Sequence, residues 1–106
     1  MAQIFTDSNF QQEVLNEKNK PVLVDFYADW CGPCQMLTPI INELAEEFGD
    51  KIKIGKVNVD ENSEVAGQYN VRSIPTLLFF KDGSMVAQSV GFMNKESLEE
   101  KIKSLI

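Results

Sequence analysis

The run Val22-Leu23-Val24-Asp25-Phe26-Tyr27 limits the possible folds more than any other part of the sequence. It is made mostly of β-branched, aliphatic and aromatic residues, and it lacks the alternation of apolar and polar residues that a strand with one wet face shows. Such a strand is buried on both faces, so we expect helices on both sides of a central sheet. Asp25 is the only charged residue in the run.

Two helices are predicted around this strand. Ser8, three residues before Gln11, predicts the cap of a first helix that ends near position 17. After Trp30, apolar residues recur at three- and four-residue spacing up to Gly49, which predicts a long helix from about position 31. Pro39 lies inside it and removes one backbone hydrogen bond, so we expect a bend there.

The second half of the chain continues the alternation and ends in a hairpin. Asp82-Gly83 between two apolar runs predicts a tight turn that joins two antiparallel strands. Asn94 predicts the cap of a last helix. We predict further strands at 52–59, 76–80 and 85–90 and a short helix at 61–69. The pattern therefore predicts an α/β fold with a mixed central sheet covered on both faces.

Length and charge narrow the function classes. The 106 residues suffice for one hydrophobic core, so we expect a single domain over 1–106. The formal net charge of −6 argues against nucleic acid as a partner. The first residues lack a basic and an apolar leader region, and no apolar run is long enough to span a bilayer, so we expect a cytoplasmic protein without membrane contact.

The only two cysteines, Cys31 and Cys34, lie at the predicted start of the long helix. One helical turn brings both sulfurs to the same side, and the free N–H groups and positive dipole end favour a reactive thiolate at Cys31. Pro33 suits the first helical turn, and Gly32 is expected to let the chain turn closely. A zinc site lacks ligands because the chain has no histidine, whereas a purely structural disulfide remains an alternative.

Three other residues have two interpretations each. Asp25 is either a solvated residue at a strand end or a buried proton carrier with a raised pKa. Lys56 is either a charge partner on the same sheet or a lysine that reaches solvent. Pro75 precedes a strand, where a trans peptide bond is the ordinary expectation and a cis bond is the rarer alternative.

Taken together, these residues resemble the thioredoxin family from one end of the chain to the other. The matching residues are Asp25, Ala28-Asp29-Trp30-Cys31-Gly32-Pro33-Cys34, Pro39, Lys56-Val57-Asn58-Val59-Asp60, Ile74-Pro75-Thr76, Gly83 and Gly91. The resemblance implies five strands and four helices, and disulfide reduction with Cys31 as nucleophile and Cys34 as resolving thiol. It also implies a cis bond before Pro75.

The resemblance further implies a groove that receives the partner's peptide. The residues implied at this groove are Trp30, Gly32, Pro33, Ile74, Pro75 and Gly91. Expected partners are disulfide-containing target proteins and a thioredoxin reductase. We expect a monomer that needs no cofactor or metal.

Two positions depart from the family pattern. Tyr27 stands where many relatives carry a second tryptophan, and Gln35 stands where many carry a basic residue, so one stabiliser of the thiolate is missing. An alternative function is an interaction module that binds partners through the groove whether or not its cysteines react. Replacing the cysteines with serine distinguishes the two functions.

Overall fold

The computed structural model describes residues 1–106 and contains one five-stranded sheet in the order β1-β3-β2-β4-β5. Its strands are β1 (Gln3–Ile4), β2 (Val22–Tyr27), β3 (Lys53–Asn58), β4 (Thr76–Lys81) and β5 (Ser84–Val90). β2 occupies the centre, parallel to β3 and antiparallel to β4. The prediction of a mixed sheet around this strand is confirmed.

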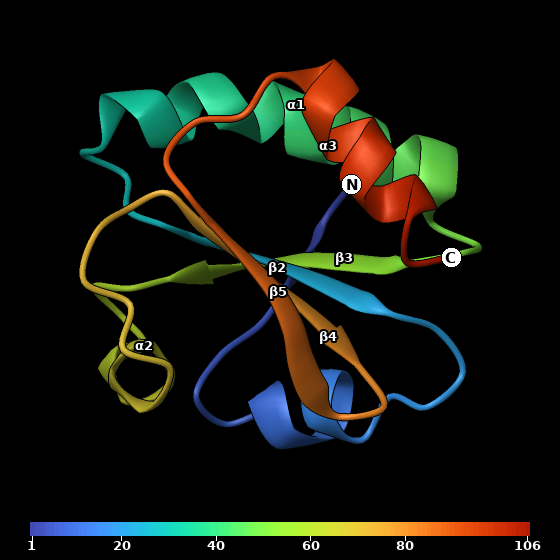
Figure 1. Ribbon diagram of the computed structural model, residues 1–106. Coiled ribbons are helices and arrows are strands. Elements are labelled where there is room, and N and C mark those ends of the chain that lie inside the picture. Colours follow the sequence, from blue (N-terminus) through green and yellow to red (C-terminus); the bar gives the residue numbers. More distant parts are fainter.

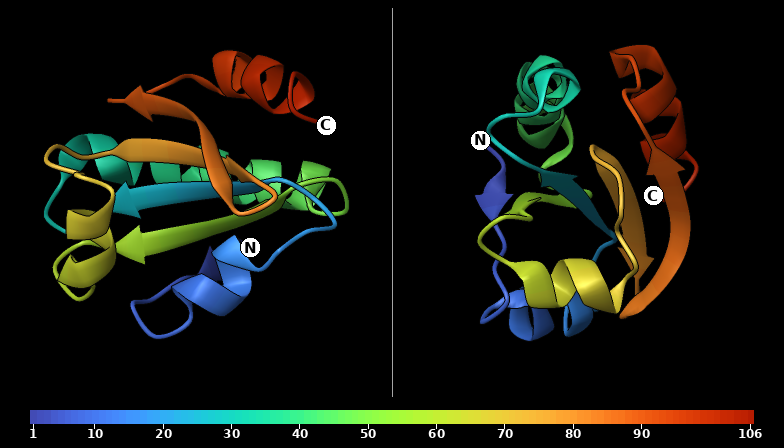
Figure 2. Two further views of the ribbon diagram at one scale, coloured as in Figure 1. Left: turned by 60° about the horizontal axis from the view of Figure 1, so that its bottom comes forward. Right: turned by 90° about the vertical axis from the view of Figure 1, so that its left-hand side faces the viewer.

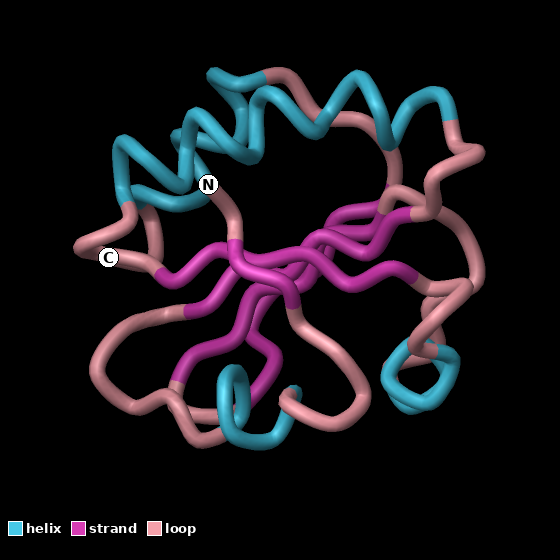
Figure 3. The backbone as a smooth tube through the Cα atoms, turned by 180° about the vertical axis from the view of Figure 1, so that it is seen from behind, coloured by secondary structure: helices cyan, strands magenta, loops and turns pink.

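Four helices cover the two faces of the sheet (Figures 1 and 2). α1 (Gly32–Phe48) and α3 (Lys95–Lys103) pack on one face. The π-helical segment η1 (Gln11–Leu15) and α2 (Ser63–Gln68) pack on the other. Seen from behind, the sheet lies as a single layer between the helices (Figure 3). The predicted α/β class with helices on both faces is therefore confirmed.

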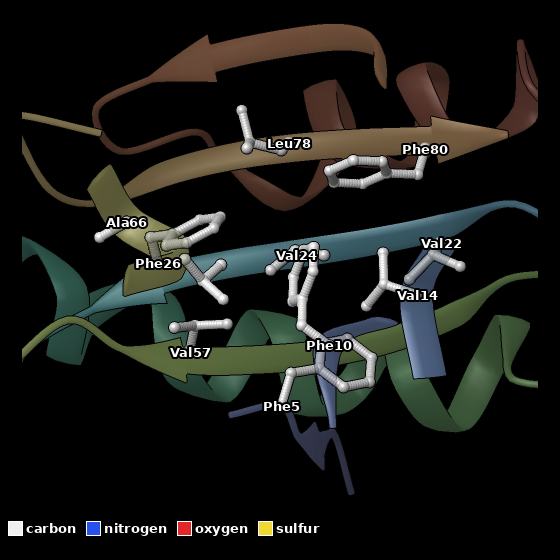
Figure 4. Packing of buried hydrophobic residues seen from close by; sticks show 11 residues of the cluster. Phe5, Phe10, Val14, Val22, Val24, Phe26, Val57, Ala66, Leu78 and Phe80 are labelled. Carbon is white, nitrogen blue, oxygen red and sulfur yellow. The ribbon is translucent and has the colours of Figure 1, made fainter. Parts of the chain in front are cut away.

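β2 contributes side chains to both cores because its residues alternate between the two faces. Val22, Val24 and Phe26 join the cluster below the sheet with residues of η1 and α2 (Figure 4). Leu23 joins the cluster above the sheet, which contains Leu37, Ile41 and Leu44 of α1. Since Asp25 follows Leu23 by two positions, it belongs to the face that α1 covers.

The cap of the first helical segment differs from the prediction. Thr6 and Asn9 bond reciprocally: the Asn9 N–H donates to Thr6 Oγ1 over 3.2 Å, and the Thr6 N–H donates to Asn9 Oδ1 over 2.7 Å. Ser8 instead pairs its hydroxyl with that of Thr6. The predicted Ser8 and Gln11 cap is wrong because the same type of reciprocal bond is made by a threonine two residues earlier.

The predicted hairpin and last helix are confirmed. Asp82 and Gly83 have φ values of 53° and 80°, which is the left-handed conformation that a tight two-residue hairpin needs. The Asn94 side chain accepts the Ser97 N–H over 2.8 Å and caps α3. α1 runs through Pro39 as one helix. None of the helices combines the length and the apolar character needed to cross a membrane.

Candidate functional site

Cys31 and Cys34 lie where the chain leaves central strand β2 and enters α1. Cys31 is the N-cap of the helix, the Cα atoms are 5.2 Å apart, and the two sulfurs form a disulfide. The Cys34 N–H donates to Cys31 Sγ over 3.2 Å. This bond gives the Cys31 sulfur a donor that would stabilise negative charge on it.

The electrostatic surroundings of Cys31 also favour a thiolate. The first turn of α1 contains no acidic residue, so no carboxylate within that turn opposes the positive end of the helix dipole. Pro33 lies in that first turn, as predicted, where its missing N–H costs no hydrogen bond. The site can therefore hold a disulfide when the cysteines are oxidised and a reactive Cys31 thiolate when they are reduced.

Cys31 is less accessible than a nucleophile at a helix start would be expected to be. Cys31 is 5% exposed and Cys34 is 1% exposed. Both pack with Ala28, and the partly buried side chains of Tyr27, Val59 and Ile74 pack against this cluster. Cys31 is therefore only slightly more open than Cys34, because neighbouring side chains close over the disulfide.

The loop before β4 faces the Cys31 sulfur. The Ile74-Pro75 peptide bond is cis, as the family resemblance implied and against the ordinary expectation for such a position. The Ile74 carbonyl oxygen lies 3.9 Å from Cys31 Sγ, and the Gly91 N–H donates to the Pro75 carbonyl over 2.8 Å. Gly91 has a φ of 97°, which glycine adopts without strain. The structure thus brings Cys31, Ile74, Pro75 and Gly91 together.

Trp30 forms an exposed flank beside the disulfide. It is 72% exposed, and its indole N–H donates to Asp60 Oδ2 over 2.9 Å. The prediction that Gly32 permits a close turn is wrong, since its φ is not left-handed and an added Cβ would meet no atom within 4 Å. What Gly32 provides is bare backbone next to the sulfurs.

Asp25 is fully buried, with 0% of its surface exposed. Neither of its carboxylate oxygens has a hydrogen-bond partner in the protein. Burial raises the pKa of Asp25 from 3.8 to about 7, and the positive charge of Lys56 opposes part of that rise. The solvated alternative is thereby excluded, and a carboxyl that titrates near neutral pH can take up or release a proton.

Lys56 is the registered neighbour of Asp25 across β2 and β3. Its Nζ donates to Thr38 Oγ1 over 3.4 Å and lies 4.2 Å from the centre of the Tyr27 ring. It forms no ion pair with Asp25 within 4.0 Å. Lys56 is thus half-buried above the sheet, and it is neither a direct salt-bridge partner nor an ordinary surface lysine.

Sequence reasoning missed several polar contacts around these residues. Gln35, one of the departures from the family pattern, donates its side-chain amide to the Asp29 carbonyl over 2.6 Å. Thr38 donates its hydroxyl to the Cys34 carbonyl over 3.1 Å. A threonine four residues after a helical carbonyl can form such a bond, and that spacing was the available signal. Cys, Asp and Glu residues nowhere form a group of three able to hold a metal ion.

Comparisons with known proteins agree with this geometry. A family profile described as thioredoxin matches residues 1–104. Thioredoxin 1 of Synechococcus elongatus is 53% identical over 98 residues, covering 92% of this chain and 91% of that protein. The thioredoxin of Rickettsia felis is 49% identical over 106 residues, covering all of both chains. The thioredoxin of Bacillus subtilis is 55% identical over 95 residues, covering 90% of this chain and 88% of that protein.

Proposed function

The chain belongs to the thioredoxin family and is a thiol-disulfide oxidoreductase with Cys31 and Cys34 as its redox pair, and we propose how its residues divide the work. Cys31 is the attacking nucleophile and Cys34 is the resolving thiol. The observation that carries this assignment is the bond from the Cys34 N–H to Cys31 Sγ at the start of α1. The reverse assignment lacks such a donor at Cys34.

The reaction consists of two thiol-disulfide exchanges. The Cys31 thiolate attacks one sulfur of a protein disulfide, a mixed disulfide forms, and the other substrate sulfur leaves as a thiolate. Cys34 then loses its proton and attacks Cys31 Sγ, which releases the second substrate thiolate and leaves the Cys31-Cys34 disulfide. The substrate gains two electrons and this chain loses two.

Asp25 is the proton acceptor for Cys34 in the second exchange. A carboxyl with a pKa of about 7 can accept a proton at neutral pH and return it in the reverse step. It belongs to the face of the sheet that α1 covers, and α1 carries Cys34 in its first turn. The positive charge of Lys56 keeps the Asp25 pKa from rising further, so that the carboxyl can exchange a proton near neutral pH.

The partner's peptide binds across the residues that surround the disulfide. Trp30 supplies an exposed apolar flank, Gly32 supplies bare backbone next to the sulfurs, and Pro33 is exposed beside it. Ile74, Pro75 and Gly91 form the opposite wall. An extended peptide could pair its backbone with Ile74 while its disulfide meets Cys31.

Protein disulfides are the substrates of this reaction. We further propose that a thioredoxin reductase returns two electrons to the Cys31-Cys34 disulfide after each cycle. In this proposal the chain acts as a single domain over residues 1–106, as a monomer in the cytoplasm, and without cofactor or metal.

Insulin reduction by dithiothreitol, followed as turbidity, tests the proposal. The wild type is expected to accelerate this reduction. Cys31→Ser is expected to abolish the acceleration, and Cys34→Ser is expected to stop after forming one mixed disulfide. Equal acceleration by the wild type and by Cys31→Ser would contradict the assignment. A biological effect that survives both substitutions would instead favour the redox-independent interaction module.

A further inference from the structure

Thr38 is a half-buried polar residue of α1, four residues after Cys34, and the exchange chemistry above assigns it no role. Its hydroxyl has a single proton, which it donates to the Cys34 carbonyl over 3.1 Å. The same oxygen accepts a hydrogen bond from the Lys56 ammonium over 3.4 Å. Because the proton is already committed to Cys34, the oxygen can only act as an acceptor toward Lys56.

A second contact holds the Lys56 ammonium in the same place. The ammonium lies 4.2 Å from the centre of the Tyr27 ring, within the range of a cation–π contact. Together, Thr38 on α1 and Tyr27 on β2 hold the cation in the half-buried layer between helix and sheet. A lysine without these contacts would extend its flexible side chain into solvent.

The position of this cation matters because Asp25 is the register neighbour of Lys56. On its other side Asp25 pairs with Leu77 of β4, which carries no charge, and Cys34 of α1 is bound in the disulfide. Tyr27, on the same strand, has a pKa raised by burial and by nearby acidic groups that include Asp25, so it stays neutral. Lys56 is therefore the one positive charge that acts on this carboxyl.

We propose that Thr38 is a positioning residue for disulfide exchange: its hydroxyl, fixed by the Cys34 carbonyl, holds the Lys56 ammonium beside Asp25. It links the backbone of the resolving cysteine to the cation that tunes the proton acceptor. The inference rests on the proposed role of Asp25 and adds a residue outside the set that the family resemblance implies.

The test uses the oxidised protein, in which neither cysteine titrates. Carbon-13 NMR follows the Asp25 carboxyl carbon across its titration in the wild type, Thr38→Val, Thr38→Ser and Lys56→Met. Valine keeps the branched shape of threonine without the hydroxyl, and serine restores the hydroxyl as the matched control. A dispersed spectrum for each variant shows that it is folded.

Thr38→Val is expected to raise the Asp25 pKa by about 0.5 pH unit or more, a roughly threefold change in its proton affinity, toward the value for Lys56→Met. Thr38→Ser is expected to return it toward the wild-type value. A Thr38→Val titration that coincides with the wild type overturns the proposal. So does a Lys56→Met variant whose Asp25 pKa does not rise.

A kinetic arm separates this inference from the proposed function. The rate at which Cys34 resolves a preformed mixed disulfide is measured against pH for the wild type, Thr38→Val and Asp25→Ala. If the inference holds, the pH dependence in Thr38→Val moves upward with its Asp25 titration. If Asp25→Ala keeps the wild-type profile, the proton role of Asp25 fails even where the NMR shift confirms the contact of Thr38 with Lys56.

Discussion

Replacing Asp25 with alanine is expected to stabilise the protein at neutral pH. In the folded chain the Asp25 pKa is about 7, against the ordinary value of 3.8 that an unfolded chain approaches. Between these values the unfolded chain has already lost the proton that the folded chain keeps, so stability falls as pH rises. The stabilising contribution of protonated Asp25 is fully present below the unfolded pKa and is lost as pH rises through the folded pKa.

The magnitude follows from the size of that interval. The interval spans about three pH units. At ~1.4 kcal/mol per pH unit, the free-energy cost of burying ionised Asp25 reaches about 4 kcal/mol at and above pH 7. The alanine variant has no carboxyl to ionise, but the substitution leaves a small cavity. The free energy of unfolding is therefore expected to rise by about 2 to 4 kcal/mol at neutral pH.

Urea unfolding of the oxidised wild type and of Asp25→Ala across about pH 4 to pH 8 measures this difference. The stability advantage of the variant is expected to grow with pH and then level off above the folded pKa. Its insulin-reduction rate is expected to fall, because Cys34 loses its proton acceptor. A stability difference that is the same at both ends of the pH range would mean that folding does not raise the Asp25 pKa.

Three further substitutions or treatments test other parts of the structure. Brief iodoacetamide treatment of the reduced protein is expected to alkylate Cys31 before Cys34, as peptide mass spectrometry would show; preferential labelling of Cys34 would reverse their roles. Gly55→Ala is expected to cost about 1 to 3 kcal/mol in urea unfolding, since the new methyl group collides with the Phe5 ring, and an unchanged midpoint would contradict that packing. Gly91→Ala is expected to cost about 1 to 2 kcal/mol through its left-handed φ of 97° alone, and a neutral result would mean that the backbone relaxes there.

The elements with a clear residue pattern could be predicted from sequence, and the two-residue strand β1 could not. The apolar run of β2 and the helical spacing of α1 predict long elements because many residues repeat one pattern. β1 has only two residues, so it shows no periodicity, and residue patterns alone indicated four strands. It exists because Gln3 and Ile4 pair with Gly55 and Lys56, a contact between distant parts of the chain.

The site shows the same division. The spacing of Cys31 and Cys34 is local, and one helical turn explains their pairing. The place of Asp25 in an apolar run was compatible with a buried carboxyl and also with a solvated residue at a strand end, and only the packing of the helices over the sheet decides for burial. The contact of Thr38 with Lys56 joins a helix to a strand, and no local pattern contains it.

Trapping of the mixed disulfide shows directly whether Cys31 is the nucleophile and Cys34 the resolving thiol. Cys34→Ser is incubated with a disulfide-containing protein such as insulin, quenched with acid, digested, and mapped by mass spectrometry. We expect a substrate peptide bound to Cys31, and no stable adduct when Cys31→Ser is treated in the same way. A stable adduct at Cys34 in the Cys31→Ser variant, with none at Cys31 in Cys34→Ser, would contradict this assignment.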